Sequence, residues 1–285
     1  MVRPTVLVSS IVVLMGGCSL FANLDGLQSG SDAGSPQDAA IGNDAPSAAD
    51  TGSGTDSSTA IDSGADAATC TCTNLLSAYR FGDPSNLGHD FMGNNNMTSV
   101  QGTPTQSSIT PDGLPGHSIA LDGASSVCIP TGFTFDSTAD HTLCWWTQPA
   151  ALANNTNQFA QQCGYDTWTT NSGADYLWHI NNCNTGTQSD LQVPNLYQVG
   201  TWVQICQTYD AASLTRSVTI NGDSTSKISV TDTAPILEDP TANWCIGSYG
   251  SGGYWTGLIY LPMWFDRILT DDEIANVSKN ACCLP

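Results

Sequence analysis

The sequence predicts an all-β domain, a sandwich or a barrel, that follows an unstructured N-terminal segment. Between residues 70 and 285, short runs of strand-forming residues alternate at regular spacing with clusters of Gly, Asn, Asp, Pro and Ser. Residues 27–69 contain no aromatic and no basic residue. Such a segment cannot bury enough apolar surface to offset the entropy that ordering it would cost. The chain therefore divides into a tether and one folded domain, whose length suits a single all-β unit.

Composition excludes several classes of protein. The chain has 6 basic residues against 26 acidic residues, a net charge of −20, so it cannot neutralise a run of phosphates and we expect no nucleic-acid partner. The same charge disfavours docking on anionic lipid through a basic patch. Eight tryptophans and 40% hydrophobic residues are enough to build a core. Eleven cysteines favour an oxidising compartment over a reducing cytosol.

Residues 1–17 have the pattern of a secretory signal peptide. Arg3 supplies the positive charge, an apolar run ends at Met15, and two glycines precede Cys18. This pattern resembles a bacterial lipoprotein signal, although Met15 stands where the family usually has Leu. The resemblance implies acylation of Cys18 and anchoring at the outer membrane or cell surface. The alternative is ordinary signal cleavage, with Cys18 a thiol or a disulfide partner.

Residues 18–69 are predicted to be a disordered, acidic, lipid-anchored linker. Asp recurs every six residues from Asp32 to Asp62. A cation-binding or repulsive brush is one interpretation, and drift in a low-complexity stalk is the one we favour. In either case the charges repel one another and extend the segment, which suits a tether.

The folded domain, residues 70–285, contains twelve candidate strands and one helix. Asn221-Gly222 is a type I′ hairpin signal. Thr270 and Glu273 form a capping box, and Leu269 and Ile274 a hydrophobic staple, which predict a helix over 271–279. The candidate strands are 75–81, 118–121, 126–129, 141–148, 158–163, 175–180, 190–193, 201–209, 216–220, 227–230, 243–246 and 258–265.

Several pieces of the domain, in order, resemble the laminin G-like, concanavalin A-like jelly-roll domains of exported bacterial proteins. One departure is Gln148 in Trp146-Thr-Gln-Pro, where the family has Lys. The resemblance implies a two-sheet antiparallel jelly-roll sandwich with a short C-terminal helix. The matching pieces are 78–81 with the turn at 90–94, 120–123, 127–130, 141–149, 202–210, 246–247, 256–259 and 267–274.

The sequence offers no catalytic machinery of a known type. The domain has two glutamates, Glu238 in a turn-like loop and Glu273 in the capping box, so the Glu-x-Asp-x-x-Glu strand of glucanases with this fold is absent. No His lies three or four residues from another His or Glu, and His179 is expected to be a satisfied polar residue on a strand. We therefore expect a protein that is not an enzyme.

Calcium is a candidate cofactor. The domain is rich in Asp and Asn, whose oxygens are the ligands that Ca²⁺ requires. Asp90 and Asn94 lie in the turn that the resembled family uses for such a site. Tyr260 stands where that family has an acidic residue in the last strand, and a solvated acidic turn is the alternative.

Four aromatic residues on predicted loops are candidates for stacking on a sugar ring. Tyr165 and Trp168 lie in a Gly/Asn/Thr-rich stretch, and Tyr249 and Tyr254 lie in a Gly/Ser-rich one. The alternative is that these rings pack against the domain. Trp145, Trp146, Trp202 and Trp255 are assigned to the core.

The ten cysteines that remain without Cys18 are predicted to form five disulfides; a metal or redox site at Cys70-Thr-Cys72 or Cys282-Cys283 is the less favoured alternative. Because the resembled fold places its first and last strands side by side, Cys70 and Cys72 should pair with Cys282 and Cys283, in an order that stays open. The other six allow fifteen pairings. The set that we favour is Cys144–Cys163, Cys183–Cys206 and Cys128–Cys245.

Together these features predict a cell-surface lipoprotein whose domain binds carbohydrate or a surface partner without catalysis. The first alternative is a structural or adhesion protein that binds protein ligands only. The second is an enzyme acting on polysaccharide.

Overall fold

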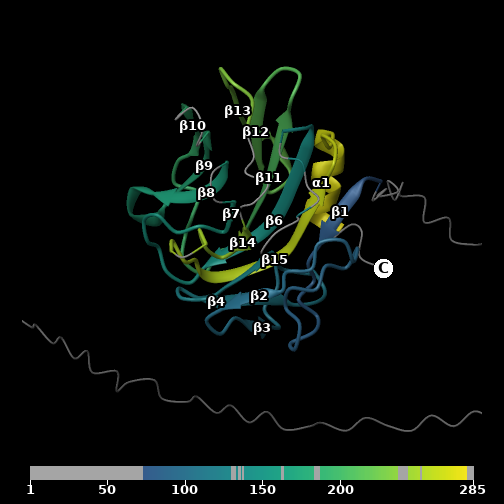
Figure 1. Ribbon diagram of the computed structural model, residues 1–285, viewed down its shortest axis with the longest axis vertical. Helices are drawn as coiled ribbons and strands as arrows, with labels where there is room; N and C mark the ends of the chain where they lie inside the picture. The colour runs from purple at the N-terminus through teal and green to yellow at the C-terminus, as the bar shows by residue number, and fades with distance from the viewer. Residues whose placement is uncertain are drawn as a thin grey trace, which may run out of the picture. The chain divides into compact units, whose positions relative to one another are not determined.

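Fifteen strands form two facing antiparallel sheets in the part of the chain that the computed structural model describes (Figure 1). The structure describes residues 73–129, 133, 136, 138–161, 164–182, 187–236, 243–250 and 252–280. One short helix, α1 (Asp271–Asn280), follows the last strand. The predicted jelly-roll sandwich with a C-terminal helix is confirmed.

The first sheet has eight strands and carries the helix on its outer face. The first strand, β1 (Leu75–Ala78), pairs with the last strand, β15 (Thr256–Phe265), as the resemblance implies. In spatial order the strands are β13 (Asp223–Thr231), β12 (Thr215–Ile220), β11 (Val203–Asp210), β6 (His141–Pro149), β15 (Thr256–Phe265), β4 (Ser118–Asp122) and β3 (Thr105–Ser107), with β1 (Leu75–Ala78) beside β15.

The second sheet has seven strands. A single 3₁₀ turn, Asn171–Gly173, separates two of them. In spatial order the strands are β10 (Thr187–Val193), β9 (Asp175–Asn182), β8 (Tyr165–Thr170), β7 (Phe159–Gln161), β14 (Trp244–Ile246), β5 (Ser126–Ile129) and β2 (Ser99–Gln101).

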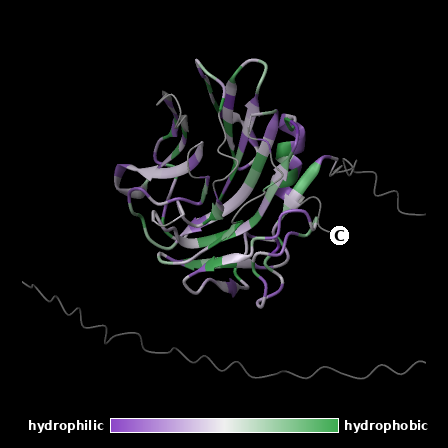
Figure 2. Cartoon of the chain, in the orientation of Figure 1, coloured by the Kyte–Doolittle hydropathy of each residue, from purple (hydrophilic) through white to green (hydrophobic). Residues whose placement is uncertain are grey.

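Alternating side chains divide each strand between the core and an outer face. On β6, Leu143 and Trp145 are fully buried in the core between the sheets. Cys144 and Trp146 point the other way, because successive residues of a strand face opposite sides. Figure 2 shows this mixture of hydrophobic and hydrophilic residues along the strands.

Helix α1 covers part of the outer face of the first sheet. Its start is the predicted capping box: the Thr270 amide donates to Glu273 Oε2 at 2.8 Å, and the Glu273 amide donates to Thr270 Oγ1 at 3.3 Å. Ile274 and Val277 are buried against a cluster that contains Cys144 and Cys206. The helix therefore covers the outer face around Cys144 and Cys206 and leaves the rest of that face uncovered by it.

The predicted hairpin turn is confirmed. Asn221 and Gly222 have φ values of 53° and 67°, the positive pair that a type I′ turn requires. The turn also approaches α1 closely, since a Cβ on Gly222 would lie 2.4 Å from Ser278 Oγ. Only Gly fits there, and the contact fixes the hairpin against the helix.

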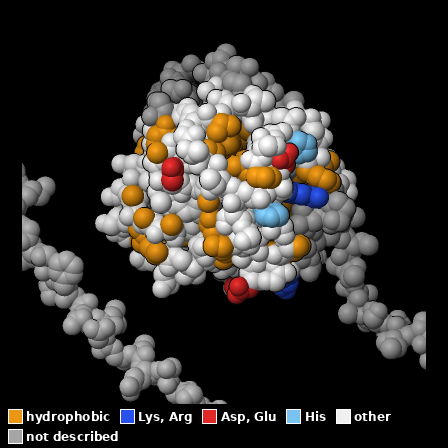
Figure 3. Space-filling model, turned by 90° about the horizontal axis from the view of Figure 1, so that it is seen from below, with side chains coloured by type: hydrophobic (Ala, Val, Ile, Leu, Met, Phe, Trp, Pro, Cys, Tyr) orange, Lys and Arg blue, Asp and Glu red, His pale blue; other side chains and the backbone are white. Residues whose placement is uncertain are grey.

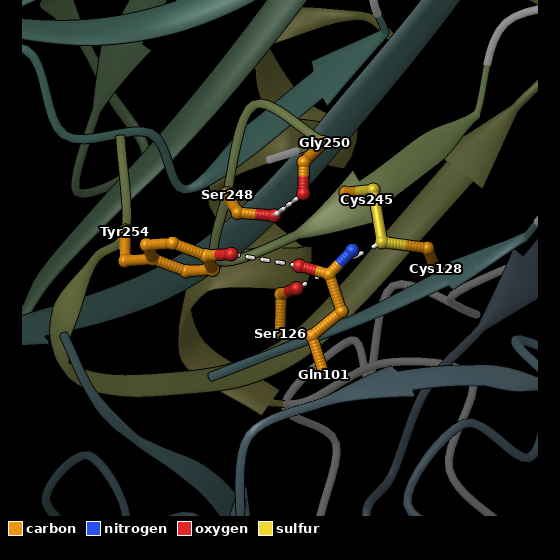
Figure 4. Close-up of a disulfide and its surroundings, with 7 residues drawn as sticks. All are labelled: Gln101, Ser126, Cys128, Cys245, Ser248, Gly250 and Tyr254. Atoms are coloured by element: carbon orange, nitrogen blue, oxygen red, sulfur yellow. Dashed lines mark hydrogen bonds between the residues drawn. A yellow bond between two sulfur atoms is a disulfide. The ribbon is translucent and has the colours of Figure 1, made fainter. Parts of the chain in front are cut away.

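Among the described residues, each sheet contains one disulfide between directly opposite residues of neighbouring strands. Cys128 pairs with Cys245 across β5 and β14, as predicted (Figure 4). Cys144 pairs with Cys206 across β6 and β11, so the predicted Cys144–Cys163 and Cys183–Cys206 pairs are wrong. The prediction assumed that consecutive strands form hairpins, whereas β6 pairs with β11 and β15 and no strand that follows it directly.

Three strands were not predicted: β2, β3 and β8. All three are rich in Ser, Thr, Gln and Asp; β2 and β8 are flanked by Gly or Asn and β3 by Pro and Ser, a composition that is typical of loops. Tertiary pairing overrides this local preference, because β8 lies between β7 and β9 and exchanges hydrogen bonds with both.

Candidate functional site

A pocket of about 640 Å³ opens on the outer face of the first sheet, at the end that α1 leaves uncovered. Its described walls come from the loop 109–112, from Trp146 and Gln148 of β6, from the segment 200–202 that leads into β11, and from Asn221 of the hairpin turn. Its volume lies within the range of pockets that hold small ligands.

Two half-buried tryptophans dominate the pocket. Trp146 projects from β6, and Trp202 stands where the chain enters the neighbouring strand β11. Trp202 also meets the buried Tyr260 ring edge to face at 6.5 Å. The assignment of Trp146 and Trp202 to the core holds only in part, because both are half-buried and pack against the cluster that contains Cys144 and Cys206. The assignment of Trp145 to the core is confirmed. The signal was in the sequence, because the adjacent residues 145 and 146 of one strand cannot face the same core.

The loop over the pocket is held by its own hydrogen bonds. Thr110 Oγ1 donates to the Leu114 carbonyl at 2.7 Å, and Ser118 Oγ donates to the Ile109 carbonyl at 2.6 Å. Tyr260 Oη donates to the Pro115 carbonyl at 2.6 Å from the sheet below. These contacts preorganise one wall, which lowers the entropy that a ligand must overcome.

The opposite wall is equally fixed. Gln148 Nε2 donates to the Gly200 carbonyl at 2.9 Å, and the Gly200 amide donates to the Pro149 carbonyl at 2.9 Å. Asn221 Oδ1 accepts the Gln204 amide at 2.8 Å, which orients the Asn221 side chain beside the pocket. Gln148 and Asn221 both line the pocket.

Tyr165 does not lie on a loop, and its predicted role in stacking is wrong. It belongs to β8, is fully buried, and donates its hydroxyl to Gln207 inside the core. Burial raises its pKa well above the usual value for tyrosine. A ring in this position cannot present a face to a ligand.

Trp168 lies on β8 too, three residues after Tyr165, and is half-buried. Its ring stacks on His179 at 4.9 Å, and His179 Nδ1 lies 2.6 Å from Asp190 Oδ1. The expectation that His179 is a satisfied polar residue on a strand is confirmed. Trp168 as a ligand residue stays a prediction, and the structure places it on the second sheet, away from the pocket.

Tyr249 and Tyr254 are half-buried in the segment between β14 and β15. Tyr254 Oη donates to Gln101 Oε1 at 2.8 Å, beside the Cys128–Cys245 disulfide (Figure 4). This bond ties the segment to β2. Neither tyrosine lines the pocket, and their role in binding stays a prediction.

The turn at Asp90 does not fit the predicted calcium site. Asp90 is fully buried, and its two carboxylate oxygens accept four backbone amides, from Ala78, Met92, Asn94 and Asn95 at 2.9–3.1 Å. Asn94 Nδ2 donates to a backbone carbonyl. The lone pairs that Ca²⁺ would need are therefore engaged in organising the turn. Within the described residues, no cluster of three or more His, Cys, Asp or Glu is placed to hold a metal ion.

Seven predicted site residues lie outside the described residues. The seven are the predicted lipidation site Cys18 and the cysteines Cys70, Cys72, Cys163, Cys183, Cys282 and Cys283.

Among the helices that are described, none has the length and apolar character that spanning a membrane requires.

Solved structures share this fold at low sequence identity. Domain 4 of AbnA, an extracellular arabinanase from Geobacillus stearothermophilus solved with arabinotriose, is 20% identical, with a TM-score of 0.56 over 72% of this chain and 98% of that one. The binding domain of botulinum neurotoxin serotype D is 12% identical, with a TM-score of 0.57; the match covers 72% of this chain but only 51% of the toxin domain. A search of curated protein sequences found no match.

The sequence itself also matches a family model. Residues 121–275, more than half of the chain, match the model described as the concanavalin A-like lectin/glucanases superfamily. This range contains the two disulfides of the described residues and most residues that line the pocket. The chain therefore belongs to the concanavalin A-like lectin/glucanases superfamily.

Proposed function

We propose that this protein is an exported, lipid-anchored surface protein whose domain binds carbohydrate, without catalysis, in the pocket of Trp146 and Trp202. The observation that carries the proposal is the pair of half-buried tryptophans beside neutral polar side chains. Flat aromatic rings present an apolar surface to a sugar ring, and neighbouring amides and hydroxyls satisfy its hydroxyl groups. The arabinotriose in the complex of the similar arabinanase domain supports this ligand class.

Trp146→Ala and Trp202→Ala are each expected to weaken glycan binding at least about tenfold, because each removes a stacking surface worth on the order of 1.4 kcal/mol or more. A glycan array first identifies a ligand, and calorimetry then measures its affinity for each variant. Trp168→Ala is the matched control, since it removes another half-buried tryptophan from the second sheet. Loss of binding in Trp168→Ala, with both pocket variants unchanged, would refute the assignment of the pocket and restore the role predicted for Trp168.

The absence of catalysis is proposed from the carboxylates of the pocket. Glycoside hydrolysis needs two carboxyl groups on opposite sides of the scissile bond. Asp112 is the one ionisable side chain among the described residues that line the pocket. We expect incubation with any bound oligosaccharide to release no shorter product.

A protein ligand is the second candidate function. Ile109, which lines the pocket, is 57% exposed, and Val199, the residue before the pocket residue Gly200, is 53% exposed. Exposed apolar side chains of this kind suit a contact with a protein better than a contact with a sugar. An array without a single glycan ligand, together with binding of a surface protein that Ile109→Ser abolishes, would favour this alternative.

Anchoring is proposed through an acyl chain on Cys18, with the linker 18–69 holding the domain away from the membrane. Cys18→Ser is expected to leave the protein uncleaved or soluble, because the lipid is attached through the cysteine sulfur, which serine lacks. Detergent-phase partitioning and intact mass measure both outcomes. A Cys18→Ser protein that still carries an acyl-chain mass would contradict the lipoprotein assignment.

A further inference from the structure

The described polar groups around the pocket are neutral with one exception. Gln148, Asn221, Thr110 and Thr201 contribute amides and hydroxyls, and Asp112 contributes one exposed carboxylate. Such groups both donate and accept hydrogen bonds, which is the chemistry of a sugar hydroxyl. A carboxylate or sulfate on a ligand can only accept, and beside Asp112 it would also be repelled.

The basic residues of the domain are not available to an acidic ligand here. None of them lines the pocket among the described residues, and four are engaged elsewhere. Figure 3 shows a face of the domain on which charged side chains are few and hydrophobic side chains form small separate groups. The four contacts are Arg216 with Asp232, Arg267 with Glu273, Lys227 with Asp271, and Arg80 over the Phe91 ring.

Gln204 is the buried polar group that the fold leaves without a partner beside this pocket. It lies on β11 directly between Trp146, its partner on β6, and Asn221, to which its backbone is hydrogen-bonded. Its side chain is fully buried, and within the described part of the chain neither amide atom has a hydrogen-bond partner. Burying such a group unpaired costs on the order of 1–3 kcal/mol. A cost of this kind is typical of a residue kept for binding.

We infer that the pocket selects neutral, hydroxyl-bearing saccharides over acidic ones, and that Gln204 is the residue that determines this specificity. The inference rests on the proposed carbohydrate-binding function. Because the Gln204 amide is fully buried, a ligand reaches it only if a neighbouring side chain such as Trp146 moves. Two sugar hydroxyls then complete the pairing, one accepting from the amide nitrogen and one donating to the amide oxygen.

The selectivity is tested with paired probes on the full mature protein. Galactotriose and trigalacturonate differ in charge at the sixth carbon of each ring, and an array that includes other neutral and acidic pairs extends the comparison. We expect each acidic probe to bind at least about tenfold more weakly than its neutral counterpart. We also expect the affinity of the neutral probe to change little with salt, because no ion pair forms. Equal or tighter binding of acidic probes would overturn the inference but not carbohydrate binding; an array with no ligand would overturn both.

Gln204→Leu separates a specificity role from a structural one. The variant replaces an unpaired amide with an apolar group of similar shape, so thermal unfolding should show equal or greater stability. Affinity for the neutral probe should fall about tenfold and its advantage over the acidic probe should shrink. Gln204→Asn, which keeps an amide, should restore part of both. A loss of stability in Gln204→Leu with unchanged affinity would show that Gln204 serves only the fold.

Discussion

Asp232→Ala is expected to lower the free energy of unfolding by about 3–5 kcal/mol, because it leaves the Arg216 guanidinium buried without its counter-charge. The Arg216 side chain is 0% exposed and that of Asp232 is 2% exposed. Two hydrogen bonds join them, from Nε to Oδ2 at 2.7 Å and from Nη2 to Oδ1 at 3.0 Å. Arg216 also donates to the Trp178 carbonyl and to Ser189 Oγ, at 2.7 and 2.8 Å. The pair therefore links β12 to β9 and β10 of the other sheet.

Urea denaturation of Asp232→Ala, of Arg216→Met and of the double variant Arg216→Met/Asp232→Ala measures the effect. The double variant should regain part of the loss, because removing both charges removes the desolvation cost along with the attraction. The matched control is Lys227→Ala, which breaks the Lys227–Asp271 pair with side chains 36% and 47% exposed, and should cost at most about 1 kcal/mol. If Asp232→Ala and Lys227→Ala cost the same, the Arg216 pair does not hold the sheets together.

Asp166→Asn is expected to stabilise the protein at pH 8 by several kcal/mol. Asp166 lies on β8, is 1% exposed, and within the described residues its Oδ1 has no hydrogen-bond partner. Desolvation by burial raises the pKa of its carboxyl from 3.8 to about 8. The folded protein therefore keeps the proton at pH values where the unfolded chain has lost it.

This difference fixes the sign of the pH dependence. Between about pH 4 and pH 8 the folded state binds one more proton than the unfolded state, so stability falls as pH rises, by about 1.4 kcal/mol per pH unit. Asp166→Asn should abolish that slope, as measured by urea denaturation at several pH values. Asp210→Asn is the control, because hydrogen bonds from Ser213 and Ala212 lower the pKa of that carboxyl and its effect lies below pH 4. An unchanged slope in Asp166→Asn would show that Asp166 is ionised in the folded protein.

Local sequence signals were reliable wherever their cause is local. The type I′ turn at Asn221-Gly222 depends on two residues that tolerate positive φ. The capping box of Thr270 and Glu273 depends on contacts within one helical turn. The turn and the start of the helix were predicted at the correct residues, since no distant residue decides them, and the helix ends one residue beyond the predicted 279.

The candidate site was missed because its residues are brought together only by strand order. Trp146 and Trp202 are far apart in sequence and become neighbours because β6 pairs with β11. The same pairing produced the Cys144–Cys206 disulfide in place of the predicted Cys144–Cys163. Sequence spacing does not determine which strand lies beside which, because connections in a sandwich cross between two sheets.

The sequence by itself determined the fold class, the hairpin and the helix cap, because composition and short-range pattern decide these. Tertiary structure alone decided which aromatic side chains face outward, which cysteines of the two sheets meet, and that Asp90 serves the backbone. The physical reason is the two-residue period of a strand. Adjacent residues of β6 face opposite sides, so Trp145 lies in the core and Trp146 lines the pocket. Only the packed sheets show what covers each face.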